Sequence, residues 1–173
     1  MRGRLIRWGL PLVLIAVAGV GAAMAATGTM RSTGGTVKTA NSKTFGTILV
    51  SSSGRTLYRY TVDSKHVNRC SSNATCNKFW PPYLVKAGAK PTAGSGANAA
   101  MLGTIKAKHN MRQVTYAGYP LYFFVSDKAA GQTKGQGFES KWYVVNSKGA
   151  LVKHAVASPP PKATTTTSKS EWG

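Results

Sequence analysis

Apolar and polar residues alternate in the first half of the chain with the period of two that is typical of β-strands. Over residues 55–62 the alternation places Tyr58, Tyr60 and Val62 on one face of a strand. Residues 47–51 just before it are β-branched and apolar, and a Ser-rich turn separates the two segments. The pattern therefore predicts a β-hairpin.

The same pattern recurs 64 positions later in the chain. The segment "GRTLYRYTVD", residues 54–63, and the segment "GYPLYFFVSD", residues 118–127, keep Gly, Leu, Tyr, an aromatic residue and Asp in register. The matching positions are Tyr58 and Tyr122, Tyr60 and Phe124, and Asp63 and Asp127. The reverse face of the second segment is apolar as well, so we expect a central strand that is covered on both sides.

A Trp-led segment follows each copy. Trp80 opens "WPPYLV" and Trp142 opens "WYVV". Pro81 and Pro82 cannot donate ladder hydrogen bonds, so the first of these strands should start late or lie at an edge. No segment shows a long helical period. The sequence predicts an all-β fold in which two pseudo-repeated hairpin-plus-strand units form one small β domain.

The N-terminus has the composition of a secretory leader. Arg2, Arg4 and Arg7 precede an apolar run that ends in small residues, with an A-x-A cleavage site at 23–25. Residues 1–26 are therefore predicted to be a signal peptide of a secreted or extracytoplasmic envelope protein. An uncleaved N-terminal membrane anchor is the alternative, because no charge interrupts the apolar run over a length that could span a bilayer.

The composition of the rest of the chain separates a spacer, a domain with an internal linker, and a tail. A polar, Gly/Thr-rich stretch predicts a flexible spacer, and a Pro/Thr-rich end that buries nothing predicts a disordered tail. The small polar stretch between the copies predicts a linker. The predicted boundaries are 27–43 for the spacer, 44–154 for the β domain (repeat 1 at 45–86, linker at 87–103, repeat 2 at 104–153) and 155–173 for the tail.

The chain is strongly basic, with 23 Lys and Arg against four Asp and Glu. Removal of the leader takes away three arginines and leaves a net charge of about +16. Such a surface attracts polyanions. Export argues against nucleic acid as the partner, so an anionic cell-wall polymer or a membrane surface is the expected counter-charge. A solvated basic surface that only favours solubility is the alternative.

Two cysteines, Cys70 and Cys76, lie close together in this predicted exported chain. That context predicts one disulfide that closes a short loop. A structural zinc site competes with this interpretation, but it needs about four ligands and the chain has no second cysteine pair. The disulfide is the preferred interpretation.

The two motif copies resemble the motif of a known protein family. The segments "YRYTVD" and "YFFVSD" resemble the bacterial secreted or lipoprotein repeat family that is marked by a Y-x-[FWY]-x-x-D motif. The block "QVTYAGYPLY", the Cys pair before "WPP" and "GQTKGQG" before "WYVV" also look like the family pattern. The resemblance implies an exported repeat protein without assigning a reaction. The chain departs from the family by lacking a lipid-attachment Cys, and by having Gln132 where the family often has Asp.

The duplicated Asp63 and Asp127 leave three roles open. Each carboxylate could accept backbone N–H groups of the turn after its strand. The pair could also bind a cation or form a catalytic carboxylate pair, which for glycoside hydrolysis requires a separation of roughly 5 to 10 Å. Gln132 removes a third carboxylate that a hard cation would use. Turn capping is the preferred role.

No catalytic constellation is present in the sequence, so we expect a protein that is not an enzyme. No cofactor is predicted and no metal ligand set is assigned. His109 and Met111 could offer copper an N/S pair, but an exposed loop explains them equally. The sequence predicts an exported, non-catalytic module of the cell envelope that binds anionic surface polymer. An extracytoplasmic metal-binding or redox accessory protein is the alternative.

Overall fold

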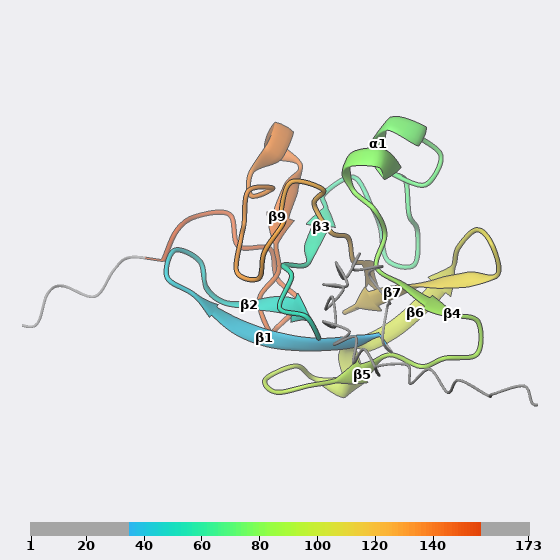
Figure 1. The fold of residues 1–173 in the computed structure, drawn as a ribbon, viewed down its shortest axis with the longest axis horizontal. Helices are drawn as coiled ribbons and strands as arrows, with labels where there is room; N and C mark the ends of the chain where they lie inside the picture. The colour runs from blue at the N-terminus through green and yellow to red at the C-terminus, as the bar shows by residue number, and fades with distance from the viewer. Residues whose placement is uncertain (1–34, 157–173) are drawn as a thin grey trace, which may run out of the picture. The chain divides into compact units, whose positions relative to one another are not determined.

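The computed structural model describes residues 35–156, and their chain path is shown in Figure 1. The elements are mostly short strands, with one short α-helix and two 3-10 turns, which confirms the all-β prediction. Their bounds are β1 (Thr36–Ser42), β2 (Gly46–Ser51), β3 (Tyr58–Tyr60), α1 (Ala74–Phe79), β4 (Leu84–Lys86), β5 (Thr92–Ala93), η1 (Ala99–Met101), β6 (Leu102–Lys106), β7 (Met111–Tyr116), β8 (Tyr119–Pro120), η2 (Phe138–Ser140) and β9 (Trp142–Val144).

The strands form three small sheets. The first has the order β2-β1-β5, the second pairs β3 with β9, and the third has the order β4-β7-β6 with β8 added to β7. All neighbours are antiparallel except β1 and β5, which run parallel. Isolated bridges join the sheets, among them Ile48 to Asn146 and Val50 to Thr56.

Strand β2 shows how the domain is built, because both of its faces are buried. Ile48 and Val50 point into one hydrophobic cluster, and Leu49 between them points into the other. Leu57 lies in the same cluster as Leu49, and Tyr58 lies in the cluster that holds Ile48 and Val50. The position of the chain between the two clusters explains why the reverse face of the second motif segment is apolar.

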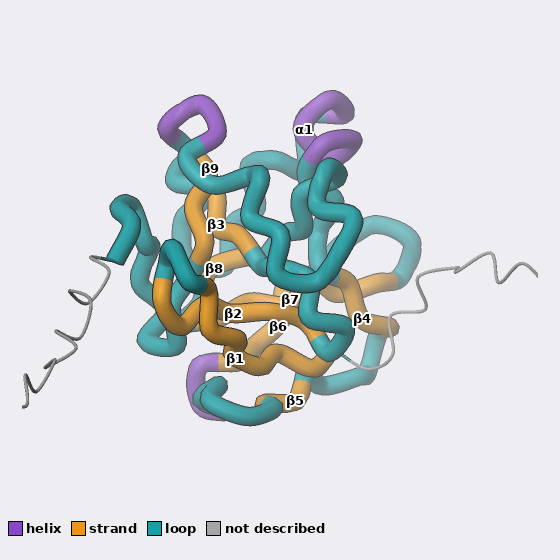
Figure 2. The backbone as a smooth tube through the Cα atoms, turned by 60° about the vertical axis from the view of Figure 1, so that its left-hand side comes forward, coloured by secondary structure: helices purple, strands orange, loops and turns teal. Residues whose placement is uncertain are grey.

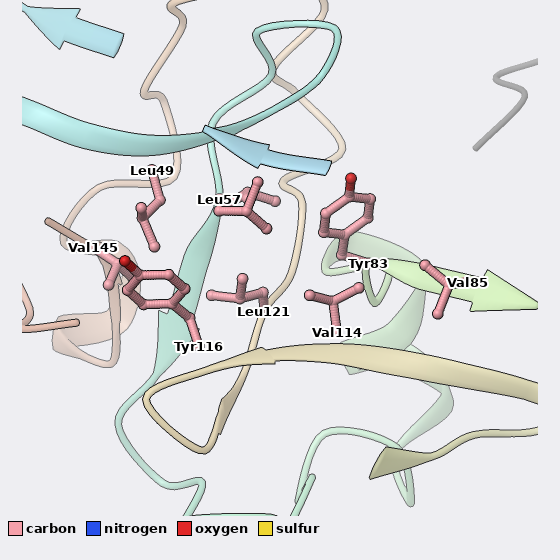
Figure 3. Close-up of a cluster of buried hydrophobic side chains, with 9 residues drawn as sticks. Leu49, Leu57, Tyr83, Val85, Val114, Tyr116, Leu121 and Val145 are labelled. Carbon is pink, nitrogen blue, oxygen red and sulfur yellow. The ribbon is translucent and has the colours of Figure 1, made fainter. Parts of the chain in front are cut away.

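One cluster is drawn in Figure 3, where Leu57 and Leu121 lie at its centre. These two leucines are the same position of the two motif copies, 64 residues apart, and both are fully buried. Tyr116 is also fully buried in this cluster, with its hydroxyl donating to the carbonyl of Ser147 at 2.8 Å. The other cluster holds the motif aromatics and both tryptophans of the repeats.

Two sequence expectations were wrong in their extent. Part of the predicted flexible spacer is β1, which pairs with β2 along its whole length and buries Val37. The predicted linker contains β5 and η1, and β5 pairs with β1. These polar segments gain their order from backbone pairing with neighbouring strands, which composition alone does not reveal.

The motif strands are also shorter than the alternation predicts. In the first copy the strand ends at Tyr60, and Val62 is exposed at 46% instead of continuing the buried face. In the second copy, Tyr122 alone among residues 121–124 forms β-bridges, and these are isolated bridges and not a continuous ladder. Tyr122 still bridges both Tyr58 and Pro82, so this segment is central as expected.

The first Trp-led segment starts as a strand at Leu84, after the two prolines. Trp80 itself is the C-cap of α1, a helix that the sequence did not predict. Asn73 caps the N-terminus of α1, because its side chain accepts the N–H of Cys76 at 3.0 Å. The helix has six residues, too few for a helical period to be visible in the sequence.

The predicted signal peptide, residues 27–34 of the spacer and most of the tail lie outside the described residues. Within residues 35–156, no helix is long and apolar enough to cross a membrane.

Candidate functional site

The two motif copies meet at Tyr58 and Tyr122. The N–H of Tyr58 donates to the carbonyl of Tyr122 at 2.9 Å, and the N–H of Tyr122 donates to the carbonyl of Tyr58 at 3.0 Å. This antiparallel bridge exchanges both hydrogen bonds between equivalent positions. The two repeats are therefore related locally by an approximate twofold axis that passes between these residues.

The motif carboxylates are exchanged between the repeats. The hydroxyl of Tyr58 donates to Oδ2 of Asp127 at 2.7 Å, and the hydroxyl of Tyr122 donates to Oδ2 of Asp63 at 2.6 Å. Both bonds are buried. Each Asp thus binds the Tyr of the other copy, and the pair of motifs forms one reciprocal unit.

The second oxygen of each carboxylate closes the loop that follows its own strand. Oδ1 of Asp63 accepts the N–H of Arg69 at 2.8 Å, and Oδ1 of Asp127 accepts the N–H of Lys134 at 2.9 Å. Both oxygens of both carboxylates therefore have protein donors. The two N–H donors lie six and seven residues after their Asp, so these contacts reach beyond the turn that directly follows each strand.

Burial perturbs the ionisation of these groups. It raises the pKa of Tyr58 and of Tyr122 far above the ordinary value, and the neighbouring carboxylates add to the effect. Both phenols stay protonated at neutral pH and remain donors. Burial also raises the pKa of Asp63, an effect that the bonds from Tyr122 and Arg69 and the charge of Arg59 oppose.

Two arginines of the first repeat lie over two aromatic rings of the second repeat. Arg55 lies over the ring of Phe123 at 4.4 Å, and Arg59 lies over the ring of Tyr119 at 3.4 Å. Arg55 is equivalent to Tyr119, and Arg59 to Phe123, by the 64-residue offset. The same cation–π contact is therefore made twice, once on each side of the axis, and the first repeat supplies the cation in both.

The motif aromatics and the two tryptophans form an aromatic column. Trp80 and Trp142 stack at its centre, 3.8 Å apart and 1° from parallel. Tyr60 stacks on the outer side of Trp142 and Phe124 on the outer side of Trp80, both at 4.4 Å. Phe124 is buried, whereas its equivalent Tyr60 is half-buried.

A pocket of about 410 Å³ opens beside this column. It lies between α1 and η2, which stand at the same end of the described domain in Figures 1 and 2. Its walls combine six aromatic residues with polar ones. The lining residues are Tyr60, Asn73, Thr75, Cys76, Phe79, Trp80, Phe124, Ser126, Phe138, Glu139 and Trp142.

The cysteine pair forms the predicted disulfide, with an S–S distance of 2.07 Å. Cys70 is buried in the cluster that holds Trp80, and the N–H of Trp80 donates to the carbonyl of Cys76 at 2.7 Å. The disulfide loop packs beside Trp80 as expected. Together with the Asn73 cap, it fixes the wall of the pocket that α1 provides.

The other residues singled out for metal chemistry lie elsewhere. Oε1 of Gln132 accepts the N–H groups of Lys128 and Ala129, so it closes the loop after Asp127. His109 lies at the exposed tip of the β6–β7 hairpin, and Met111 begins β7. Within residues 35–156 no group of three or more His, Cys, Asp and Glu side chains is placed to hold a metal ion.

The profile of a family described as a secreted repeat of unknown function matches residues 35–83 and 103–146. The chain belongs to this family. Its two matches contain the two motif copies, and the secreted-repeat description agrees with the extracytoplasmic location expected from the leader. Comparison with curated proteins and with solved structures gives no significant match.

Sequence reasoning missed several features that this secreted-repeat protein uses at the pocket and the axis. Phe79, Phe138 and Glu139 lie outside the motif and carry no signal of their own. The two cation–π pairs between the repeats could have been predicted from the sequence, because alignment of the two copies places Arg55 and Arg59 against two aromatic residues. The pairing itself depends on how the repeats dock.

Proposed function

We propose that this secreted repeat is a non-catalytic module of the cell envelope that binds anionic surface polymer. The observation that carries the proposal is the near absence of exposed negative charge. Three acidic residues lie within 35–156: Asp63 and Asp127 are buried, and Glu139 is exposed next to Lys141. The basic residues of this part of the chain therefore face solvent with little compensation.

One end of the third sheet carries a group of these basic residues. No acidic residue lies between Asp63 and Asp127, an interval with eight Lys and Arg that includes all of β4, β6 and β7. At the tip of the β6–β7 hairpin, Lys106 pairs with Arg112 across the strands, and Lys86 on β4 pairs with Met111. Lys86, Lys106 and Lys108 are all exposed. We call Lys86, Lys106, Lys108 and Arg112 the basic tip.

The chemistry of the motif carboxylates supports a binding role over catalysis. General acid–base work on a substrate requires a carboxyl group that can reach the reacting atoms. Asp63 and Asp127 are instead buried, and each has a tyrosine hydroxyl and a backbone N–H as donors. These contacts explain the duplicated acid without a substrate.

The proposal is tested with cell-wall fragments and with long-chain polyphosphate as probes. Binding of the full exported chain should weaken steadily as salt rises from low to physiological concentration and above, because ions screen exposed charges. Replacement of Lys86, Lys106 and Lys108 by Gln should weaken binding more than the matched replacement of Lys43, Lys128 and Lys148, three exposed lysines outside the tip. Both triple variants lose the same charge.

The outcomes separate the alternatives. Equal weakening by the two triple variants would mean that overall charge and not the basic tip binds the polymer. Absence of salt-sensitive binding to either probe would overturn the proposal. Stoichiometric metal uptake that does not depend on salt would instead support the metal-binding or redox accessory role.

A further inference from the structure

The pocket between α1 and η2 differs in charge from the rest of the described surface. None of its lining residues is Lys or Arg, although basic residues greatly outnumber acidic ones in the chain. It does contain Glu139, the one exposed carboxylate of the three acidic residues within 35–156. A ligand at this place meets the Glu139 carboxylate close by, with Lys141 as its ion-pair partner, and lysines farther away act on the ligand only through screening solvent.

Aromatic residues line the same pocket as this carboxylate. Phe79 and Phe138 are 45% and 41% exposed, unusual for large apolar side chains, and both line the pocket. Behind them lie the buried Trp80 and Trp142. Ring faces carry negative partial charge, so a group of rings with one carboxylate is chemically suited to a cation that has apolar substituents.

The structure already shows an ammonium group at this carboxylate. Nζ of Lys141 lies 3.6 Å from Oε2 of Glu139, with both side chains about half exposed. This contact is open to exchange, because ion pairs between exposed side chains are weak. A ligand ammonium could therefore replace Lys141 at little cost.

The backbone holds Glu139 in place in an uncommon conformation. Gly137, Glu139 and Ser140 all have left-handed backbone angles, with φ of 73°, 49° and 54°. Residues other than glycine adopt this region at a cost in free energy, and such strain is concentrated at ligand sites. The turn is closed by the N–H of Gly137, which donates to the carbonyl of Trp142 at 2.8 Å.

We propose that this pocket binds an organic ammonium group, with the alkyl substituents against the rings of Phe79 and Phe138 and the charge beside Glu139. The volume of about 410 Å³ is within the range of small-molecule sites. A polyol such as a sugar fits less well, because the side-chain oxygen of Asn73 is already used to cap α1. The inference is independent of the binding of anionic polymer at the basic tip.

The test is an NMR titration of the full exported chain with choline, with its neutral isostere 3,3-dimethylbutan-1-ol and with glucose. Choline should shift the resonances of Phe79, Phe138 and Trp142 at lower concentration than the isostere. Glu139→Gln should weaken choline binding about two- to fivefold and leave the isostere unaffected. Phe138→Leu should weaken choline binding by a similar factor, through loss of a ring.

Two further variants make the result decisive. Lys141→Gln removes the internal competitor and should strengthen choline binding, whereas Lys148→Gln, an exposed lysine outside the pocket, makes the same charge change and should have less effect. Equal binding of choline and its isostere, unaffected by Glu139→Gln, would show an apolar site and overturn the proposal. So would preferential shifts with glucose, or no shift with any probe in a folded sample.

Discussion

The hydroxyl of Tyr58 donates to the carboxylate of Asp127, 2.7 Å away and in the other copy of the motif. The equivalent bond from Tyr122 to Asp63 completes the exchange. A single repeat would leave its buried carboxylate without this donor, at a considerable cost in free energy. The motif therefore needs a second copy to hydrogen-bond its buried carboxylate and hydroxyl. This requirement gives a physical reason why the motif occurs twice in this chain.

Replacement of the motif carboxylates should lower the stability of the domain by different amounts. Asp63→Ala and Asp127→Ala each remove the acceptor for a buried hydroxyl and a backbone N–H, so we expect losses of about 1–3 kcal/mol in the free energy of unfolding. Asp63→Asn and Asp127→Asn should cost less, because the amide oxygen still accepts one bond. Urea unfolding measures the four values.

A matched control for these variants is Glu139→Ala, which changes an exposed carboxylate and should alter stability by less than about 0.5 kcal/mol. Chelator should make no difference to any of the five proteins. If the Asp variants unfolded like the parent in chelator and differed from it only when metal was added, the carboxylates would form a cation site and would not stabilise the loops that follow their strands.

Reduction of the disulfide should have a modest effect. The bond between Cys70 and Cys76 closes a loop with a sequence separation of six, and the entropy of so short a loop corresponds to roughly 2 kcal/mol. Intact mass with and without reductant checks the bond, and urea unfolding under the two conditions measures its contribution. Two free thiols in the exported protein would contradict the structure.

Because Cys76 lies within α1, which provides one wall of the pocket, reduction should also affect the surroundings of Trp80. Tryptophan fluorescence and near-UV circular dichroism would report this change. A double variant with both cysteines replaced by Ser should behave like the reduced protein. If it matched the oxidised parent instead, the disulfide would not support this wall.

The repeat and its strands could be predicted because they depend on local pattern. Strand β2 begins one residue before the predicted segment, and the motif offset relates Leu57 to Leu121, which the structure buries in one cluster. Strand β1 could not be predicted in the same way. Its sequence is mainly polar, and its order comes from pairing with β2 and β5.

The candidate sites depend on contacts that a linear pattern does not contain. The alignment of the copies relates Asp63 to Asp127, but it does not say which tyrosine each carboxylate meets. The exchange arises from the docking of one repeat on the other through Tyr58 and Tyr122. The same docking stacks Trp80 on Trp142 and so creates the column beside the pocket.

Ionisation of Asp63 should make stability depend on pH. Burial raises the pKa of this carboxyl group in the folded protein above 3.8, so the protonated form is favoured on folding. Its stabilising contribution is complete below the unfolded pKa and is lost as the pH rises through the folded pKa. Asp63→Asn should remove this part of the pH dependence, as measured by urea unfolding between about pH 3 and 7.

Tyr122→Phe provides a second test of the same linkage. The Tyr122 hydroxyl stabilises the ionised carboxylate, so its removal should raise the pKa of Asp63 further. Carbon-detected NMR of the carboxyl group follows the titration directly. Tyr58→Phe is the control, because that hydroxyl bonds to Asp127 and should leave the Asp63 titration nearly unchanged. A lower pKa in Tyr122→Phe would contradict the assigned contact.

The exchange between the repeats predicts which pairs of substitutions are coupled. Tyr58→Phe and Asp127→Ala remove the two ends of one hydrogen bond, so their effects on the free energy of unfolding should not add. We expect a coupling of about 0.5–3 kcal/mol in a double-mutant cycle. Tyr122→Phe with Asp63→Ala should show coupling of similar size. Both cycles are measured by urea unfolding at neutral pH.

The control cycles use the same four substitutions in the other combination. Tyr58→Phe with Asp63→Ala, and Tyr122→Phe with Asp127→Ala, pair residues of one repeat that share no hydrogen bond between their side chains. Their coupling should be smaller than in the exchanged pairs. Larger coupling within a repeat than between repeats would mean that each motif copy is satisfied internally, and the exchanged arrangement would be wrong. Because every substitution occurs in both kinds of cycle, a general loss of stability cannot produce the expected difference.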